Sequence, residues 1–177
     1  MTYTLWNTRH TIRRSVCLLI AITGDQLPQQ DTCNCRGGPG NCPVQGKCQN
    51  RGVIYKTGVT ETRTGTPPSH TYIGMTGRSF KERWDEHKYD IRHPSEKEKT
   101  KLSTHCWDLQ ARGKEYNLEW KIIDRATTFN PTTKKCRVCL KEKYHIMYSK
   151  DSHPLNKRQE VFSTCRHMAQ KRLSNVE

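Results

Sequence analysis

Residues 33–48 read CNCRGGPGNCPVQGKC, a segment in which four cysteines stand among glycine, proline and polar residues. With almost no apolar side chains, this segment cannot bury a core of its own, so cross-links or a metal must hold it. Tetrahedral Zn²⁺ bound by four thiolates would fold it. The spacing is not a common zinc-finger pattern, which leaves disulfides and free thiols as alternatives. We expect a zinc knuckle over residues 32–50, with ligands Cys33, Cys35, Cys42 and Cys48.

A second group of metal-ligating residue types lies toward the C-terminus. Cys136 and Cys139 are two residues apart, and Cys165 and His167 follow later in the chain. Together they suit a Cys3His zinc site, although cysteines on a helix are also ordinary small apolar residues. The odd total of nine cysteines favours metal over a complete disulfide framework. Cys17 and Cys106 have no evident partners, and we expect both to be unpaired.

The chain is strongly basic. Its 177 residues carry 31 Lys+Arg against 17 Asp+Glu, a net charge of +14. This charge suggests a polyanionic partner, most simply DNA, and a merely soluble basic surface is the alternative. The C-terminal segment, 161–177, continues a basic stretch whose candidates for neutralising phosphates are Lys157, Arg158, Arg166, Lys171 and Arg172.

The chain is long enough for one core, with little apolar material left for a second. Residues 1–31 show no sustained hydrophobic period and are expected to form a poorly ordered leader. Three arginines before the apolar run 16–22 imitate a signal peptide, but the residues after the run make a poor cleavage site. The run is also far shorter than the ~20 residues that cross a bilayer. We therefore expect no membrane partner and a reducing, intracellular location.

Residues 51–160 predict an α+β domain, with a small three-stranded antiparallel sheet flanked by helices. Strand-like segments at 53–55 and 71–74 flank a loop rich in Thr, Gly and Pro, which is typical of a hairpin. The alternation of Tyr116, Leu118, Trp120 and Ile122 marks a third strand.

Three helices are predicted in the same region. The first runs from Ser79 to about Ile91, with Ser79 as N-cap and Glu82 completing a capping box. The second covers 102–111, after a charged loop at 93–101 that is expected to be solvated. The third starts near Thr133 and should turn a broad apolar face inward, formed by Val138, Leu140, Tyr144, Ile146 and Met147.

An ordered set of residues then points to a family. Val53-Ile54-Tyr55, Tyr72-Ile73-Gly74, Arg83, Glu142 and Asn156 resemble, in order and context, the motifs of the GIY-YIG nuclease superfamily. The closest resemblance is to the GIY-YIG endonuclease module of Penelope-like retroelements, through the phrases CNCR…CPxxGKC, LSxHxW, CxxCLxEKY, LNKRxE and STCRH. It covers 33–167. The chain departs from the pattern where Val53 replaces the first glycine, and in the wide gap between Tyr55 and Tyr72.

The resemblance implies a role for each residue. Tyr55 would orient or deprotonate the attacking water, Tyr72 would support the phosphate, and Asn156 would brace the site. Arg83 offers a planar, permanently charged fork suited to a phosphate, and His87 lies one helical turn further on the same face. Glu142 would be the hard oxygen ligand for Mg²⁺. His105 is a weaker candidate for the site.

The expected function is a metal-dependent DNA endonuclease that hydrolyses a phosphodiester bond. By resemblance it would nick target DNA for retroelement integration in the nucleus, beside a reverse transcriptase that these residues do not contain. Two other classes remain open. One is a catalytically inactive, zinc-containing DNA-binding module derived from such an element, and the other is a secreted disulfide-rich protein.

Overall fold

The computed structural model describes residues 33–62, 70–157, 162, 164, 165 and 167. The predicted leader, Cys17 and four residues of the basic stretch, Arg158, Arg166, Lys171 and Arg172, lie outside them. Among the described helices, none has the length and apolar character needed to cross a membrane. In chain order the elements are η1 (Pro39–Asn41), β1 (Arg51–Glu61), β2 (His70–Ser79), α2 (Phe80–Arg92), η2 (Pro94–Glu96), α3 (Lys101–Ala111), β3 (Tyr116–Arg125), β4 (Phe129–Asn130), β5 (Lys135–Cys136) and α4 (Arg137–Tyr148).

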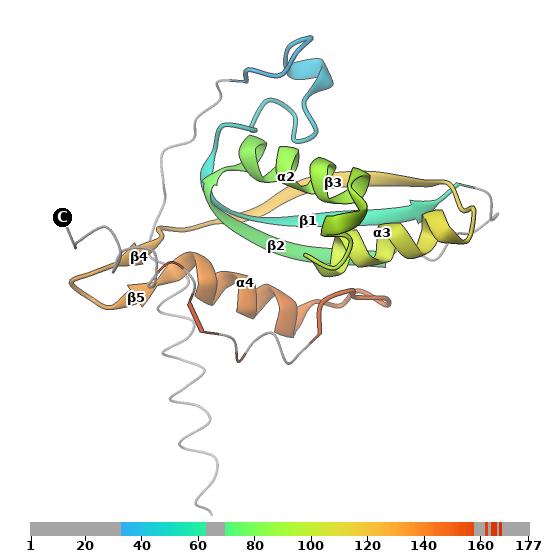
Figure 1. The fold of residues 1–177 in the computed structure, drawn as a ribbon. Coiled ribbons are helices and arrows are strands. Elements are labelled where there is room, and N and C mark those ends of the chain that lie inside the picture. Colours follow the sequence, from blue (N-terminus) through green and yellow to red (C-terminus); the bar gives the residue numbers. More distant parts are fainter. Residues whose placement is uncertain (1–32, 63–69, 158–161, 163, 166, 168–177) are drawn as a thin grey trace, which may run out of the picture.

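The main sheet confirms the predicted α+β class. It has three antiparallel strands in the order β2-β1-β3, so β1 is central (Figure 1). Both hairpin strands extend further than predicted, because the ladder continues from Tyr55 to the pair of Val59 and His70. Gly52 lies at the irregularity where β1 meets β2 and has a φ of 60°, a conformation that favours glycine.

Alternation along the strands divides the core into two layers. On one face, Tyr55 and Tyr72 pack with Phe80 of α2 and Leu102 of α3. The predicted third strand adds Tyr116, Leu118, Trp120 and Ile122 to this face, as expected. On the other face, Ile54 and Ile73 pack with Val138 and Ile146 of α4. Figure 1 shows α2 above the sheet and α4 below it.

The first helix begins as predicted, because the side chain of Ser79 accepts a hydrogen bond from the backbone N–H of Glu82 and the Glu82 carboxylate accepts one from the Ser79 N–H. The predicted start of the third helix near Thr133 is wrong, since α4 begins at Arg137. The side-chain oxygen of Asn130 accepts hydrogen bonds from the N–H groups of Thr132 and Thr133. This closes a turn between β4 and β5 in place of a helical start.

The predicted apolar face of α4 is narrower than expected. Val138 and Ile146 are buried, Leu140 and Tyr144 are half-buried, and Met147 is exposed. The buried positions between Val138 and Ile146 belong to Cys139 and to a charged residue, Lys141. A buried lysine requires a partner, and Asp124 of β3 provides it.

Candidate functional site

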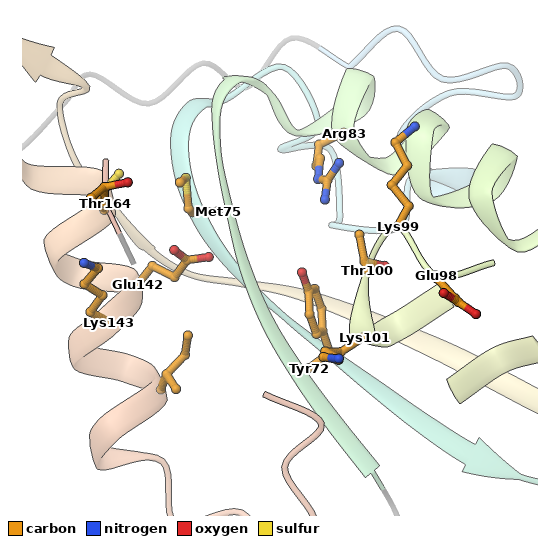
Figure 2. Close-up of a pocket in the computed structure, with 12 residues that line it drawn as sticks. Tyr72, Met75, Arg83, Glu98, Lys99, Thr100, Lys101, Glu142, Lys143 and Thr164 are labelled. Carbon is orange, nitrogen blue, oxygen red and sulfur yellow. The ribbon is translucent and has the colours of Figure 1, made fainter. Parts of the chain in front are cut away.

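One cleft lies at the β2 edge of the sheet, where the α2–α3 layer and α4 approach from opposite faces (Figure 2). Its volume is about 330 Å³. Three of the residues selected from the sequence line it, namely Tyr72, Arg83 and Glu142. Figure 2 shows Glu142 reaching from α4 toward β2, with Arg83 and Tyr72 on the other side of that strand. The fold therefore gathers a phenol, a guanidinium and a carboxylate from three separate elements.

Tyr55 lies behind this cleft and does not line it. Its ring is fully buried, and its hydroxyl oxygen is 2.6 Å from Nε2 of His87 and accepts a hydrogen bond from Nε of Arg83 at 3.2 Å. Because an arginine can only donate, the Tyr55 oxygen is the acceptor in that bond, and its own proton is available to Nε2 of His87 in the tautomer that leaves this nitrogen unprotonated. Arg83 is held further by Glu86, whose carboxylate is 2.8 Å from Nη1. The tyrosine thus fixes the direction of the guanidinium.

Burial sets the charges in this group. It lowers the pKa of His87 to about 3, and the positive charge of Arg83 adds to the effect, so the imidazole is neutral near pH 7. Burial likewise raises the pKa of Tyr55, with Tyr72 adding to the shift, and the phenol stays protonated. For Arg83, burial opposes the charged form, but Tyr55 and Glu86 outweigh it and raise the guanidinium pKa. A permanent positive charge therefore stands beside neutral hydrogen-bonding groups.

Gly74 makes the close packing of the tyrosines possible. A Cβ atom at this position would lie 2.5 Å from the Tyr55 hydroxyl oxygen and 2.9 Å from Cε1 of Tyr72. Both distances are below van der Waals contact, and both rings sit in the core, where they have little room to shift. Any side chain at residue 74 would displace the two tyrosines.

We expect Gly74→Ala to destabilise the protein by about 2 kcal/mol, as overpacking of a core does. Gly40→Ala is the matched control, because a Cβ there meets nothing within 4 Å. The midpoint of urea unfolding measures both. Equal midpoints for the two variants would contradict the close approach of the Tyr55 ring to Gly74.

Asn156 supports β2 from the outside. Its side-chain oxygen accepts a hydrogen bond from the N–H of Ile73 at 2.6 Å, and its amide nitrogen donates to the carbonyl of Ile73 at 2.9 Å. Two more backbone bonds join this segment to Thr71, from Thr71 N to His153 O and from Leu155 N to Thr71 O. The segment therefore satisfies polar groups on the free edge of β2, next to Tyr72.

His105 lies away from the cleft. It is half-buried on α3, and its ring centroid is 4.4 Å from that of His70. Cys106, the next residue, is buried in the core and belongs to neither cysteine group.

The orientation of α4 is fixed by a carboxylate on β3. Asp124 Oδ1 accepts from Lys141 Nζ at 2.7 Å, and its other oxygen is 3.0 Å from Nε2 of His145. Lys141 also donates to the carbonyl of Arg125 at 3.0 Å. Burial raises the pKa of Asp124, but the hydrogen bonds from Lys141 and His145 outweigh it and hold the carboxyl pKa below its usual value. Lys141 and His145 are one helical turn apart, and Glu142 lies between them in the chain. Because both bind Asp124, this carboxylate sets the rotation of α4 and with it the direction of the Glu142 side chain.

Asp124→Asn should destabilise the protein by about 2 kcal/mol, because it leaves the ammonium of Lys141 buried beside a neutral amide. Asp151→Asn is the control. Asp151 pairs with Lys56, whose side chain is 35% exposed against 9% for Lys141, so its loss should cost well under about 1 kcal/mol. Urea unfolding at pH 7 distinguishes them, and equal losses would contradict a buried anchor.

The N-terminal cysteines converge as predicted. Their four Sγ atoms all lie within 4.8 Å of one another, with Sγ–Sγ distances of 3.7 Å for Cys35 and Cys48 and 3.6 Å for Cys33 and Cys48. Tetrahedral zinc with sulfur ligands at 2.3 Å separates sulfurs by roughly 3.8 Å, so the group could hold zinc. The knuckle abuts the start of α2, where the N–H of Lys81 donates to the carbonyl of Cys48 at 2.8 Å. It therefore fixes the helix that carries Arg83.

The second group also converges as predicted. Cys136 and Cys139 Sγ are 3.4 Å apart, Cys139 and Cys165 Sγ are 3.5 Å apart, and His167 Nδ1 is 3.3 Å from Cys139 Sγ. Three sulfurs and one imidazole nitrogen at these distances could hold zinc. Cys139 also lines the cleft, one turn before Glu142. The first cysteine group thus adjoins α2 and the second adjoins α4, two of the helices that line the cleft.

We expect about two zinc ions per chain by elemental analysis of reduced protein, one for each four-ligand group. Cys42→Ser and Cys165→Ser should each lower the content by about one. Cys106→Ser removes a buried thiol outside both groups and should leave the content unchanged. A parent protein without zinc would contradict the assignment of both groups.

Several residues of the site escape sequence reasoning. Lys99, Lys101 and Lys143 line the cleft, although 93–101 reads as a solvated loop. Lys99 is anchored there by the fully buried Asp90, at 3.2 Å. Sequence reasoning also misses Asp124. The signal that points to such a residue is Lys141, because a lysine between apolar positions of α4 needs an acidic partner.

Comparison with protein-family models, curated proteins and solved structures finds no match to this chain. The fold class and the cysteine groups therefore rest on the structure alone, and the assignment of a function rests on the chemistry of the cleft.

Proposed function

We propose that this protein is a metal-dependent DNA endonuclease of the GIY-YIG type. The observation that supports this best is the single cleft in which Tyr72, Arg83 and Glu142 meet, with Tyr55 and His87 packed behind them. Hydrolysis of a phosphodiester needs a positioned water, a cation for the developing negative charge and a stabilised leaving oxygen. The cleft offers a residue type suited to each requirement.

Arg83 would bind the scissile phosphate. Its guanidinium is held by Tyr55 and Glu86 and lines the cleft, so it need not be reorganised when the phosphate arrives. Lys99, Lys101 and Lys143 around the same cleft would contact neighbouring phosphates. The net charge of +14 agrees with a polyanionic substrate.

The roles of the two tyrosines would differ from those that the resemblance implies. Tyr72 lines the cleft and could orient the attacking water there. Tyr55 has no exposed surface, and its hydrogen bonds to Arg83 and His87 suit a positioning role. His87, neutral near pH 7, would hold the Tyr55 proton in place.

Glu142 is the residue that would hold Mg²⁺. It is half-buried, lines the cleft and reaches toward Tyr72 and Arg83 (Figure 2). One carboxylate together with substrate phosphate oxygens is an ordinary ligand set for this ion. When bound, the ion would stabilise charge on the leaving oxygen. Zinc in the two cysteine groups would have a structural task, that of fixing α2 and α4 on either side of the cleft.

The biological setting proposed here is that of the retroelement module. The enzyme would nick target DNA in the nucleus and act beside a reverse transcriptase. An inactive, zinc-containing DNA-binding module is the second candidate. The complete burial of Tyr55 and its raised pKa favour that candidate, because a covered, protonated phenol cannot itself deprotonate water.

Nicking of supercoiled plasmid in Mg²⁺ tests the proposal. Glu142→Gln should reduce the rate by at least about a hundredfold, because it weakens the hold on an ion worth several kcal/mol in the transition state. Glu98→Gln is the matched control, since Glu98 is a second carboxylate of the same cleft and should leave the rate within a factor of about three.

Equilibrium binding of the same DNA accompanies the nicking assay. Glu142→Gln should keep or improve the affinity, because it removes a negative charge near phosphate. Absence of nicking by the parent protein, with DNA binding intact, would favour the inactive module. Equal nicking by the parent and Glu142→Gln would remove Glu142 from the site.

A further inference from the structure

The C-terminal half of α4 exposes large apolar side chains. Tyr148 is 56% exposed and Met147 is 46% exposed. Consecutive residues of a helix point about 100° apart, so the two do not share one surface, and Tyr148 is the one that lines a pocket beside α4. Both lie at the end of the helix, beyond the part that packs on the core.

A pocket of about 380 Å³ opens beside these residues, between α4 and the face of the sheet. Its apolar floor is formed by Ile73 and Ile123, and Tyr144 and Tyr148 form a wall. None of its lining residues lines the cleft that contains Glu142. It is therefore a separate site, on the other side of α4.

The wall of the pocket is aromatic. The ring centroids of Tyr144 and Tyr148 are 4.7 Å apart, with the planes inclined at 40°, and His145 lies 5.6 Å from Tyr144. Rings in this arrangement brace one another, and the exposed Tyr148 leaves ring surface open to a ligand. Tyrosine favours flat partners, because its ring offers a large rigid area and loses little conformational entropy.

The rim of the pocket carries positive charge. The ammonium of Lys56 pairs with the carboxylate of Asp151, so these two lining residues neutralise each other. The exposed Lys150 adds a further ammonium. Aromatic rings beside lysines match the bases and phosphates of an unpaired polynucleotide strand.

We propose that this pocket binds one base of an unpaired polynucleotide strand, stacked on Tyr148. A duplex cannot use the pocket in this way, because both faces of its bases are already stacked on their neighbours. The site requires neither Glu142 nor a catalytic ion, so it extends beyond the proposed nuclease activity. Its volume suits a single nucleotide, with the base on the tyrosines and the phosphate near Lys150.

Fluorescence anisotropy of the full chain in buffer without Mg²⁺ tests this site. The probes are a labelled 12-residue oligodeoxythymidine, the matching oligouridine and a 12-base-pair duplex. Tyr148→Ala should weaken binding of the single strands about tenfold, as loss of one stacked base does, and change duplex binding less than about twofold. Tyr148→Phe keeps the ring and should retain the parental affinity.

The matched control is Tyr89→Ala. Tyr89 is exposed to a similar extent, 50%, but lies on α2, stacked on His93. It should leave single-strand binding within about twofold of the parent. An equal loss in Tyr148→Ala and Tyr89→Ala, an equal loss for duplex and single strand, or no loss in Tyr148→Ala would each overturn the proposal. A difference between the DNA and RNA strands would identify which polynucleotide is the ligand.

Plasmid nicking by Tyr148→Ala separates this proposal from the nuclease assignment. Nicking near the parental rate, together with lost single-strand affinity, is the expected result. If the parent protein does not nick DNA at all, the anisotropy comparison still decides the question of the pocket.

Discussion

Burial of β1 on both faces is the constraint on which the rest of the structure depends. As the central strand it pairs with β2 and β3, and its consecutive residues Ile54 and Tyr55 enter opposite core layers. Helices must therefore cover both faces of a sheet only three strands wide. The helices approach each other at the β2 edge, and the cleft forms there. Its position follows from sheet topology before any functional residue is considered.

Two polar groups behind the cleft are each held between two partners. The Tyr55 hydroxyl lies between Arg83 and His87, and the Asp124 carboxylate lies between Lys141 and His145. Burying such polar groups without partners would cost several kcal/mol of folding free energy. Each set of hydrogen bonds therefore permits essentially one orientation of the helix that takes part in it. The hydrogen bonds of Tyr55 orient the side chain of Arg83, and those of Asp124 orient the side chain of Glu142. The cleft is thus preorganised by contacts made behind it.

The cysteine groups extend the same principle to segments that lack a core. The knuckle at 33–48 contributes little apolar surface beyond Val44 and its cysteines, yet it contacts the first turn of α2. The second group joins the first turn of α4 to Cys165 and His167. Metal in both would fasten the two helices at the ends nearest the cleft. A small, highly charged chain would gain rigidity in this way without a larger core.

The sequence by itself determined the features that depend on the spacing of residues along the chain. The alternation from Tyr116 to Ile122, the capping box of Ser79 and Glu82, and the grouping of the cysteines each depend on spacing, and the structure agrees with all three. The start of α4 was misplaced because Asn130 closes a turn that hydrophobic periodicity does not register. Only the tertiary structure decided that Tyr72 reaches the cleft while Tyr55 is covered, and that Asp124 anchors Lys141. Those outcomes depend on which residues from distant segments share a core layer, and spacing along the chain carries no information about that.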